Sequence, residues 1–461
     1  MHQLRMNFAQ FSKRIISNDK KFLLFVGIFA FILRFIFLLS IEDGFYFTDT
    51  VYYEDCAKNI LNGEGFGDYR KAPLYPLWIS AVYSLTGGRN VFLLRLAEVV
   101  LSTLLCVILF YIAKRIFNRS IGMTTSLIAA IFPMFIFLPV ANYPTLLSTF
   151  LVTSGVYLTL LLENSDRKLL PIFIGCLFGL SALAVAPTAT LIVPVIVWVL
   201  AHVKLKRKQS MIQTVLILSS FVLVLTPWTY RNYTKYHKLI PIRHDAAFNM
   251  PIVRKLEERN RQKSSNRVAS TSSNHTTSTS RQIQAAPTQK KRISSILKDP
   301  ATLFLTNSKQ FFSFWQISPE GTLASAEPNH NLKFHEKDKR IAKTNIFSIS
   351  QVTYLISKLS YGPVLFFAFI GLLLIRKHFH QASLLIFTIL TLALTYSFFW
   401  AKLRYRIPIE PLIVVMAAYG LIASFEKIRA LSLKLLFKPG SGYLNPADGI
   451  SRAYTSYETE K

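Results

Sequence analysis

One acidic residue stands near the start of a short polar and aromatic stretch between two long apolar runs. Asp49, Tyr53 and Ala57 are spaced four residues apart, so they lie on one face if this stretch is a helix. A carboxylate such as that of Asp49 can act as a general base. It could instead cap the helix, because an oxygen side chain at a helix start accepts from free amide groups. We predict that the next acids, Glu54 and Asp55, are solvated.

Four basic residues lie beside aromatic and proline residues in segments that join the apolar runs. They are Lys71, Arg231, Arg404 and Arg406. One such cation could simply be solvated, but several cations at one membrane interface suit a phosphate group on a lipid. We therefore predict that Lys71, Arg231 and at least one of Arg404 and Arg406 converge on a site with Asp49 at its rim.

The elements that must position these residues are long apolar runs. The chain has 461 residues, of which 51% are hydrophobic and 17% charged, and its mean hydropathy is +0.35. Runs of about 20 residues can cross a hydrocarbon core of roughly 30 Å, so a soluble, fibrous or mainly disordered protein is excluded. We predict an all-α polytopic membrane protein with about ten transmembrane helices. We expect Pro139 with Pro144 to break the helix pair at 120–162 and Pro187 to break the pair at 169–203. The predicted spans are 22–41, 91–113, 120–139, 143–162, 169–185, 187–203, 211–229, 352–375, 381–400 and 408–425.

The short basic loops predict the orientation. The net charge is +29, and clusters such as Lys114, Arg115 and Arg119 fall on one side of the predicted helices. Such loops are typically cytoplasmic and contact anionic lipid, so this charge does not indicate nucleic acid. We expect a multi-pass protein of the cell (inner) membrane with both termini in the cytoplasm. The first span reads as a retained signal anchor, because no small-residue cleavage site follows it.

The spans divide the chain into five parts. A stretch at 264–280 holds 11 Ser or Thr among 17 residues and almost nothing apolar, so we predict that it is disordered. The parts are a cytoplasmic segment at 1–21, a transmembrane module at 22–229 with a first outer loop at 42–90, an outer region at 230–351, transmembrane helices at 352–425 and a cytoplasmic tail at 426–461.

Two charged residues lie inside the first two spans. Arg34 and Glu98 are each about seven residues from the outer end of their span, which is a depth of roughly 10 Å. An unpaired charge at this depth costs several kcal/mol. We predict that the two side chains pair or share polar partners. The alternative is that Arg34 snorkels outward and that Glu98 pairs with Arg95.

Five short motifs lie in a fixed order between the predicted spans. They are Asp49-x-x-x-Tyr53-x-x-x-Ala57, Asn62-Gly63-x-Gly65, Lys71-x-Pro73-x-Tyr75-Pro76, Thr226-Pro227-Trp228-x-x-Arg231-Asn232-Tyr233 and Arg404-Tyr405-x-x-Pro408. Together these motifs resemble those of bacterial glycosyltransferase family 39, which belongs to the GT-C superfamily with the protein O-mannosyltransferases and the lipid A aminoarabinose transferase. The resemblance covers about 20–245 and 350–425.

This resemblance implies a membrane glycosyltransferase that moves a sugar from a polyprenyl-phosphate carrier to a glycan, lipid or protein acceptor at the outer face. It implies that Asp49 is a general base or orients the acceptor, and that Lys71 contacts the lipid phosphate. Because Asp49 matches the family position and begins a predicted helix, we predict that it is the essential acid. The resemblance also suggests Tyr53 and Tyr75, with Arg231, Arg404 and Arg406, as substrate-binding residues.

Two departures from the family pattern bear on metal binding and activity. The stretch Ala141–Thr145 lacks the acidic residue that the family usually has there, and Val185-Ala186-Pro187 lacks an Arg. The three cysteines, Cys56, Cys106 and Cys176, have no metal-binding spacing. We therefore predict no metal ligands and no certain cofactor, since the missing acid argues against a divalent cation.

Two other functions fit parts of the sequence. A transporter or flippase of lipid-linked glycans would place broken helices and ionisable residues near the bilayer midplane, usually in repeated halves. We find no internal repeat, and the unusual residues gather at one interface. A non-catalytic scaffold descended from transferases would account for the two departures.

Overall fold

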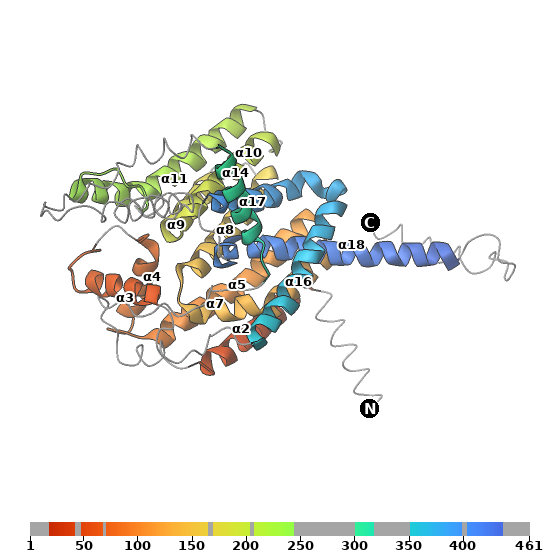
Figure 1. Ribbon diagram of the computed structural model, residues 1–461, viewed down its shortest axis with the longest axis horizontal. Helices are drawn as coiled ribbons and strands as arrows, with labels where there is room; N and C mark the ends of the chain where they lie inside the picture. Colours follow the sequence, from red (N-terminus) through yellow and green to blue (C-terminus); the bar gives the residue numbers. More distant parts are fainter. Residues whose placement is uncertain are drawn as a thin grey trace, which may run out of the picture.

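The computed structural model is an assembly of α-helices (Figure 1), and no strand occurs among the residues that it describes. These are 18–41, 48–67, 71–164, 169–202, 207–243, 300–317, 351–398 and 403–436. The α-helices are α2 (Asp19–Leu39), α3 (Thr48–Leu61), α4 (Leu74–Ser84), α5 (Val91–Ile116), α6 (Arg119–Ile131), α7 (Pro133–Ala141), α8 (Pro144–Leu161), α9 (Leu169–Ala184), α10 (Ile192–His202), α11 (Arg207–Tyr236), α14 (Pro300–Phe314), α16 (Gln351–Leu374), α17 (Phe379–Ser397) and α18 (Glu410–Leu436). Short 3-10 helices, η1 to η5, lie at Leu162–Asn164, Ala186–Leu191, Ile375–His378, Leu403–Tyr405 and Ile407–Ile409.

Six helical runs in the described part of the chain are long and apolar enough to cross a membrane. They are Asp19–Leu39, Val91–Ile116, Pro144–Leu161, Lys208–Tyr236, Lys358–Ser397 and Ile407–Ser432. The pair α6 and α7 counts as a seventh if it is one bent span, and two apolar helices, Leu169–Ala184 and Ala186–Ala201, are shorter. The run Lys358–Ser397 contains most of α16 and all of α17, which the sequence predicted as two spans. The polytopic all-α class is thus confirmed, whereas the number of spans depends on how the broken helices are counted.

Prolines mark the breaks between the apolar helices. The break predicted at Pro139 with Pro144 is confirmed, because α7 ends at Ala141 and α8 begins at Pro144. A further break, which the sequence did not predict, bends the chain by 49° between α6 and α7, where Phe132 is extended and Pro133 begins the new helix. Proline disfavours the helical conformation of the residue before it, which explains a break at Phe132. Pro187 interrupts its pair, because it lies in η2 between α9 and α10.

Small residues let two helix pairs approach closely. A Cβ atom on Gly420 of α18 would collide with the carbonyl oxygen of Phe367 in α16, and one on Gly371 would collide with that of Met416. Gly175 of α9 faces the carbonyl of Ile217 in α11 in the same way. Glycine allows such backbone contact, which is a common way for helices to associate inside a bilayer.

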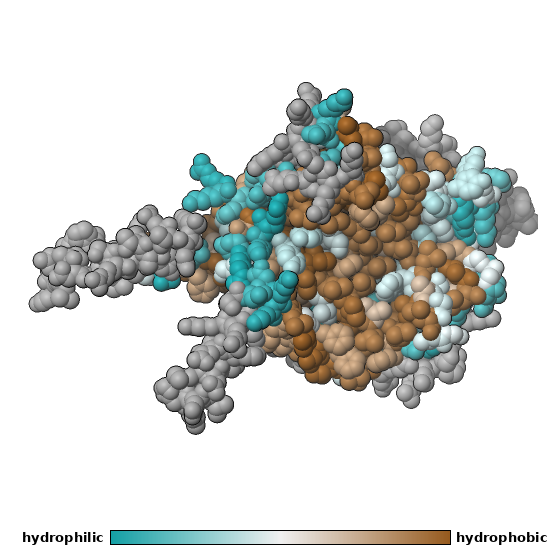
Figure 2. Space-filling view, turned by 180° about the vertical axis from the view of Figure 1, so that it is seen from behind, coloured by the Kyte–Doolittle hydropathy of each residue, from teal (hydrophilic) through white to brown (hydrophobic). Residues whose placement is uncertain are grey.

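Large apolar side chains face outward on several of the long helices. Examples are Leu24 on α2, Leu223 on α11 and Leu373 on α16. Figure 2 shows one face of the molecule as a broad hydrophobic surface, with hydrophilic residues gathered toward its two sides. A soluble protein rarely exposes so large an apolar surface, so this face suits contact with lipid.

Arg34 is buried in the helix bundle and binds carbonyl groups and a hydroxyl. Its side chain is 0% exposed, and Nε donates to the Ser102 hydroxyl at 2.8 Å. The remaining donors reach the carbonyl oxygens of Ala30, Ala129 and Ala130. Ala129 and Ala130 lie in the last turn of α6, where backbone carbonyls have no helical partner. The bend after α6 therefore supplies acceptors for Arg34, which neither snorkels nor pairs with Glu98.

Glu98 has a different partner. It is 1% exposed, and one of its oxygens accepts from the Tyr75 hydroxyl at 2.6 Å. The predicted ion pair between Arg34 and Glu98 is wrong. The positions of Arg34 and Glu98 within their spans predicted correctly that both side chains lie in the bundle interior. Their partners depend on the α6–α7 bend and on the position of Tyr75, which the sequence does not reveal.

Basic residues of the predicted cytoplasmic loops meet acids at one end of the bundle. Asp19, in the first turn of α2, accepts from Lys114 and from Arg119, the latter at 2.6 Å. Glu163 after α8 lies 3.9 Å from Arg115. These pairs fasten the start of α2 and the end of α8 to the turn between α5 and α6. We refer to Asp19, Lys114 and Arg119 as the Asp19 cluster.

Some predicted parts lie outside the described residues. They include the Ser/Thr-rich stretch at 264–280, most of the N-terminal segment and the tail beyond 436. Two differences are visible elsewhere. The predicted tail begins at 426, but α18 continues to Leu436, and the outer region contains a helix, α14, that the sequence did not predict.

Candidate active site

Asp49 lies in the first turn of α3, as the sequence predicted. Its side chain is 39% exposed, whereas Tyr53 and Ala57 further along the helix are buried. A negative charge is favoured at this end of a helix, because the free backbone N–H groups carry a partial positive charge. The helix start therefore presents the carboxylate, while the rest of its face packs into the protein.

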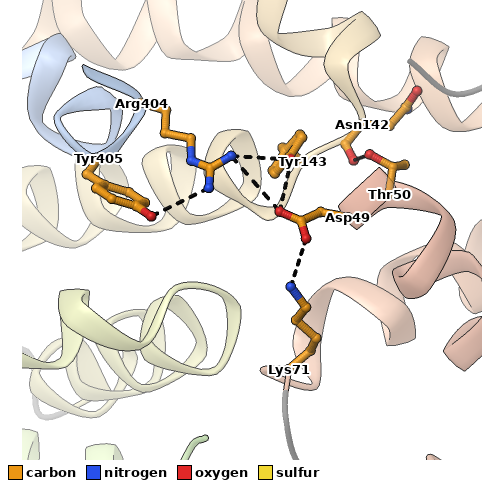
Figure 3. A network of polar contacts seen from close by, with 7 residues as sticks. All are labelled: Asp49, Thr50, Lys71, Asn142, Tyr143, Arg404 and Tyr405. Carbon is orange, nitrogen blue, oxygen red and sulfur yellow. Dashed lines mark hydrogen bonds and ion pairs between the residues drawn. The ribbon is translucent and has the colours of Figure 1, made fainter. Parts of the chain in front are cut away.

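Three side chains from separate segments surround the Asp49 carboxylate (Figure 3). Lys71, just before α4, donates to Oδ1 at 3.0 Å. The Tyr143 hydroxyl, from the residue before α8, donates to Oδ2 at 3.1 Å. Arg404 in η4 lies 4.0 Å from Oδ2, and we call these four residues the Asp49 cluster.

The charges of this cluster support one another. Burial alone would raise the pKa of Asp49, but the charges of Lys71 and Arg404, with the hydrogen bonds from Lys71 and Tyr143, hold it below its usual value. Burial would lower the pKa of Lys71, but Tyr53 and Asp49 outweigh this and raise it. Asp49 is therefore ionised and Lys71 protonated at neutral pH.

Lys71 also lies against aromatic rings. Its ammonium is 5.5 Å from the ring centroid of Tyr53 and 5.7 Å from that of Tyr52, which is within cation–π distance. A further cation, Arg243, acts electrostatically on both Lys71 and Tyr53. Positive charge thus exceeds negative charge around Asp49.

Tyr75 is buried next to Tyr53, on which the Lys71 ammonium lies. Its side chain is 0% exposed, its hydroxyl donates to Glu98, and its ring meets that of Tyr53 edge to face at 5.4 Å. The resemblance suggested Tyr75 as a substrate-binding residue. Tyr75 lies in the first turn of α4 and packs in the core.

The two predicted arginines near the end of the chain have different surroundings. Arg404 is 31% exposed and contacts the Tyr143 and Tyr405 hydroxyls at 3.4 and 3.5 Å. Burial would lower its pKa, but Tyr143, Tyr405 and Asp49 raise it. Arg406 is fully buried, and its Nε binds Glu410 at 2.5 Å.

Arg406 serves the helix packing. Its Nη1 donates to the carbonyls of Phe314 and Gln316 at the end of α14, and its guanidinium lies over the Tyr361 ring at 4.9 Å. These contacts join α14, α16 and α18. The predicted convergence on Asp49 therefore involves Arg404 and not Arg406.

Arg231 binds the end of the glycine-rich turn that follows α3. Its Nη2 donates to the carbonyl of Gly67 at 2.7 Å, and the same oxygen accepts from Lys235 and Tyr236. The guanidinium also lies 4.8 Å from the Trp228 ring centroid. The structure thus places Arg231 on the glycine-rich turn after α3, apart from the contacts of the Asp49 carboxylate.

Glu54 is buried, contrary to the prediction that it is solvated. It is 1% exposed and accepts from Lys58, Tyr83 and Arg89 at 2.7–2.8 Å. Its position five residues after Asp49 turns it away from the site and toward α4. Asp55 is partly buried.

Sequence reasoning missed Tyr143, Tyr405 and Arg243. Tyr143 lies in the stretch Ala141–Thr145, which lacks the acidic residue of the family, and Tyr405 lies within the Arg404 motif. Neither residue was predicted to have a role. The signal that could have identified Tyr143 is the Asn-Tyr-Pro sequence, in which a residue that tolerates a left-handed turn precedes a helix start.

The residues around Asp49 do not fit a divalent cation. Both carboxylate oxygens already accept hydrogen bonds, and two cations face them. No group of three or more His, Cys, Asp or Glu side chains gathers in the described part of the chain. A divalent ion prefers several oxygen ligands and is repelled by cations of this kind.

The fold and the site together define a polytopic membrane protein with a polar, cationic site at one end of its helices. A model of the family described as dolichyl-phosphate-mannose-protein mannosyltransferase matches residues 70–230. A search of curated proteins gave no significant match.

Solved structures of similar fold include two proteins in complex with a polyprenyl-type lipid phosphate. The oligosaccharyltransferase AglB from Archaeoglobus fulgidus, in complex with an inhibitory peptide and a dolichol-phosphate, is 15% identical with a TM-score of 0.54, covering 95% of this chain and 53% of that one. ArnT from Cupriavidus metallidurans, bound to undecaprenyl phosphate, is 14% identical with a TM-score of 0.52, covering 96% and 69%. The chain thus spans about half the length of AglB. These structures show that the chain shares its fold with AglB and ArnT, and this likeness and the family match agree with the resemblance to the GT-C superfamily.

Proposed function

We propose that this protein transfers a sugar from a polyprenyl-phosphate carrier to an acceptor hydroxyl at the outer face of the membrane. The observation that carries this proposal is the Asp49 cluster, in which one ionised carboxylate lies beside two cations at the end of the helices. Structural neighbours bind dolichol-phosphate or undecaprenyl phosphate, which supports a lipid phosphate as the donor's carrier.

In the proposed reaction the acceptor oxygen attacks the anomeric carbon of the sugar. The bond between that carbon and the carrier phosphate oxygen breaks, and its electron pair remains on the phosphate. Asp49 receives the proton of the acceptor hydroxyl as the new bond forms. The products are the glycosylated acceptor and the polyprenyl phosphate.

Lys71 and Arg404 would stabilise the phosphate as its charge develops. Both are partly exposed, at 24% and 31%, and both remain charged at neutral pH. Cations fixed in place before the reaction need little reorganisation, which is the main source of electrostatic catalysis. Tyr53 would support Lys71 through its ring, and Tyr75 would support Tyr53. Arg231 would act by fixing the turn that precedes Lys71.

We also propose a sidedness for the site. The Asp19 cluster belongs to the basic loops expected in the cytoplasm, and the Asp49 cluster belongs to the segments expected outside. In a bacterial cell this places the site on the periplasmic side of the inner membrane, with both termini in the cytoplasm. Reporter fusions at the C-terminus, read for cytoplasmic or periplasmic activity, test this orientation.

Reconstitution tests the proposed reaction. Purified protein in liposomes would be given a panel of labelled undecaprenyl-phosphate hexoses and pentoses, with a membrane extract as the source of acceptors. We expect transfer of label out of the carrier fraction and formation of undecaprenyl phosphate. If no sugar leaves the carrier with any donor, the proposed activity is wrong.

The same liposomes separate the alternatives. A flippase would move the labelled lipid between leaflets without breaking the sugar–phosphate bond, which leaflet-specific oxidation of the sugar would reveal. A scaffold would show neither translocation nor transfer.

A further inference from the structure

The turn before α8 directs Tyr143 at Asp49. Asn142, at the end of α7, has φ 51° and ψ 54°, in the left-handed region. Non-glycine residues seldom adopt this conformation, although asparagine tolerates it better than most. The turn allows the chain to leave α7 and enter α8 with the Tyr143 side chain beside Asp49 (Figure 3).

Two buried contacts hold this turn from behind. The Asn142 side-chain oxygen accepts from Arg95 Nε of α5 at 3.1 Å. Its backbone carbonyl accepts from the Thr50 hydroxyl at 3.2 Å. Thr50, Arg95 and Asn142 are all at most 1% exposed. Thr50 and Asn142 are the chain neighbours of Asp49 and Tyr143. The hydrogen bond between Thr50 and Asn142 therefore fixes the two site residues relative to each other.

The Tyr143 hydroxyl lies between Asp49 and Arg404. It donates to Asp49 Oδ2 at 3.1 Å and accepts from Arg404 Nη1 at 3.4 Å. Burial and the charge of Asp49 raise the pKa of Tyr143 well above its usual value, so the phenol keeps its proton. The direction of the hydrogen bond to Asp49 is thereby set.

We propose that Tyr143 is a positioning residue for Asp49: its neutral hydroxyl, held by the Asn142 turn, fixes the carboxylate plane from Oδ2 while Lys71 fixes it from Oδ1. This inference rests on the proposed function of Asp49 as the base. One oxygen lone pair then has a constant direction toward the acceptor hydroxyl. Orientation of this kind contributes to the rate because the reacting groups need not find their geometry during the reaction.

The Tyr143→Phe variant tests the proposal through the rate and its pH dependence. We expect kcat to fall about tenfold with the donor KM nearly unchanged, because one hydrogen bond to a charged group is lost. The charged and titratable groups acting on Asp49 are Lys71, Arg404 and Tyr143, and Tyr53 is a further titratable neighbour. Loss of the Tyr143 donor should move the acidic limb of the kcat profile to higher pH. A purely structural tyrosine would not move this limb.

Variants of the turn and a distant tyrosine provide controls. Asn142→Gly keeps the left-handed backbone and should retain more activity than Asn142→Ala, which strains it. Tyr419→Phe removes a buried hydroxyl that donates to the Leu374 carbonyl in the packing of α16 and α18. It should change neither kcat nor the pH profile.

A spectroscopic measurement makes the result independent of turnover. Infrared difference spectra between wild type and Asp49→Asn would follow the titration of Asp49 alone, and the same spectra would be recorded in the Tyr143→Phe background. A higher midpoint without Tyr143 supports the contact even if no donor is turned over. An unchanged midpoint, or an active Tyr143→Phe enzyme with the wild-type kcat and pH profile, overturns the positioning role while leaving the transferase proposal intact.

Discussion

Two aspartates in this protein occupy similar positions at opposite ends of the helices. Asp19 lies in the first turn of α2 and Asp49 in the first turn of α3, and each has two basic side chains nearby. Their exposures are similar, at 26% and 39%. Residue type and side-chain exposure therefore do not distinguish the two clusters.

The two aspartates differ in what binds the second oxygen of the carboxylate. At Asp19 both oxygens bind cations directly, with Arg119 at 2.6 Å. At Asp49 the neutral Tyr143 hydroxyl occupies that position, and Arg404 remains at 4.0 Å. A direct pair satisfies both charges and joins two segments. A guanidinium held back by a neutral group keeps hydrogen-bond donors for another anion, so we assign a structural role to the first cluster and a chemical role to the second.

The largest effect should come from removing each carboxylate's charge. Asp49→Asn keeps the shape of the side chain but removes the base, so we expect kcat to fall by roughly 10² to 10⁴-fold. The matched variant Asp19→Asn should retain transfer and instead lower the melting temperature slightly. Donor turnover and thermal melting in the same detergent measure both, and equal activity of the two variants would remove the distinction.

Arg404 and Arg406, which are two residues apart, give a second comparison. Arg406 forms a buried ion pair with Glu410, whereas Arg404 is partly exposed beside Asp49. Arg406→Met leaves Glu410 charged and buried, which costs about 3–5 kcal/mol. We expect low expression and a markedly lower melting temperature, whereas Arg404→Met should fold normally. Size-exclusion profiles of the two variants decide this, and a stable Arg406→Met protein would contradict the packing role.

Cations of the two clusters should differ in their effect on the donor. Lys71→Met and Arg404→Met each remove a contact that we assign to the carrier phosphate, worth about 1.5–3 kcal/mol. The donor KM should therefore rise about tenfold or more. Lys114→Met, in the Asp19 cluster, should leave it unchanged, and a similar rise in that variant would indicate a general effect of charge on lipid binding.

The smallest expected effect is a shift in pH dependence. Transfer requires the ionised carboxylate, so activity is lost as the pH falls through the pKa of Asp49. Because this pKa is held below the usual value of about 4, wild-type activity should persist to acidic pH. Lys71→Met removes the largest of the lowering contributions and should move the acidic limb upward. Profiles of kcat measured in a stable liposome preparation would show it, and a downward shift would contradict the assignment.

The sequence predicted much of this arrangement because its signals are local. Apolar length predicted the long helices, and spacing of four predicted that Tyr53 and Ala57 follow Asp49 along one face of a helix, which α3 provides. Motif order brought Asp49, Lys71 and Arg404 into one expected site, and the structure places these three together. Their roles remain predictions.

Other features depend on contacts between distant segments, which spacing does not encode. Arg406 resembled Arg404 in sequence, and only the position of Glu410 and of the end of α14 separates them. The acceptors of Arg34 lie at the bend before Pro133, which the sequence did not predict. Tyr143 was overlooked because its role depends on the left-handed conformation of Asn142.

A structure of the protein in nanodiscs with undecaprenyl phosphate tests the central claim most directly. We predict that the phosphate contacts Lys71 and Arg404 beside Asp49, while Arg406 stays bound to Glu410 and the Asp19 cluster is unchanged. A phosphate bound at the Asp19 cluster or elsewhere, with no contact to Lys71 or Arg404, would contradict this assignment of the site.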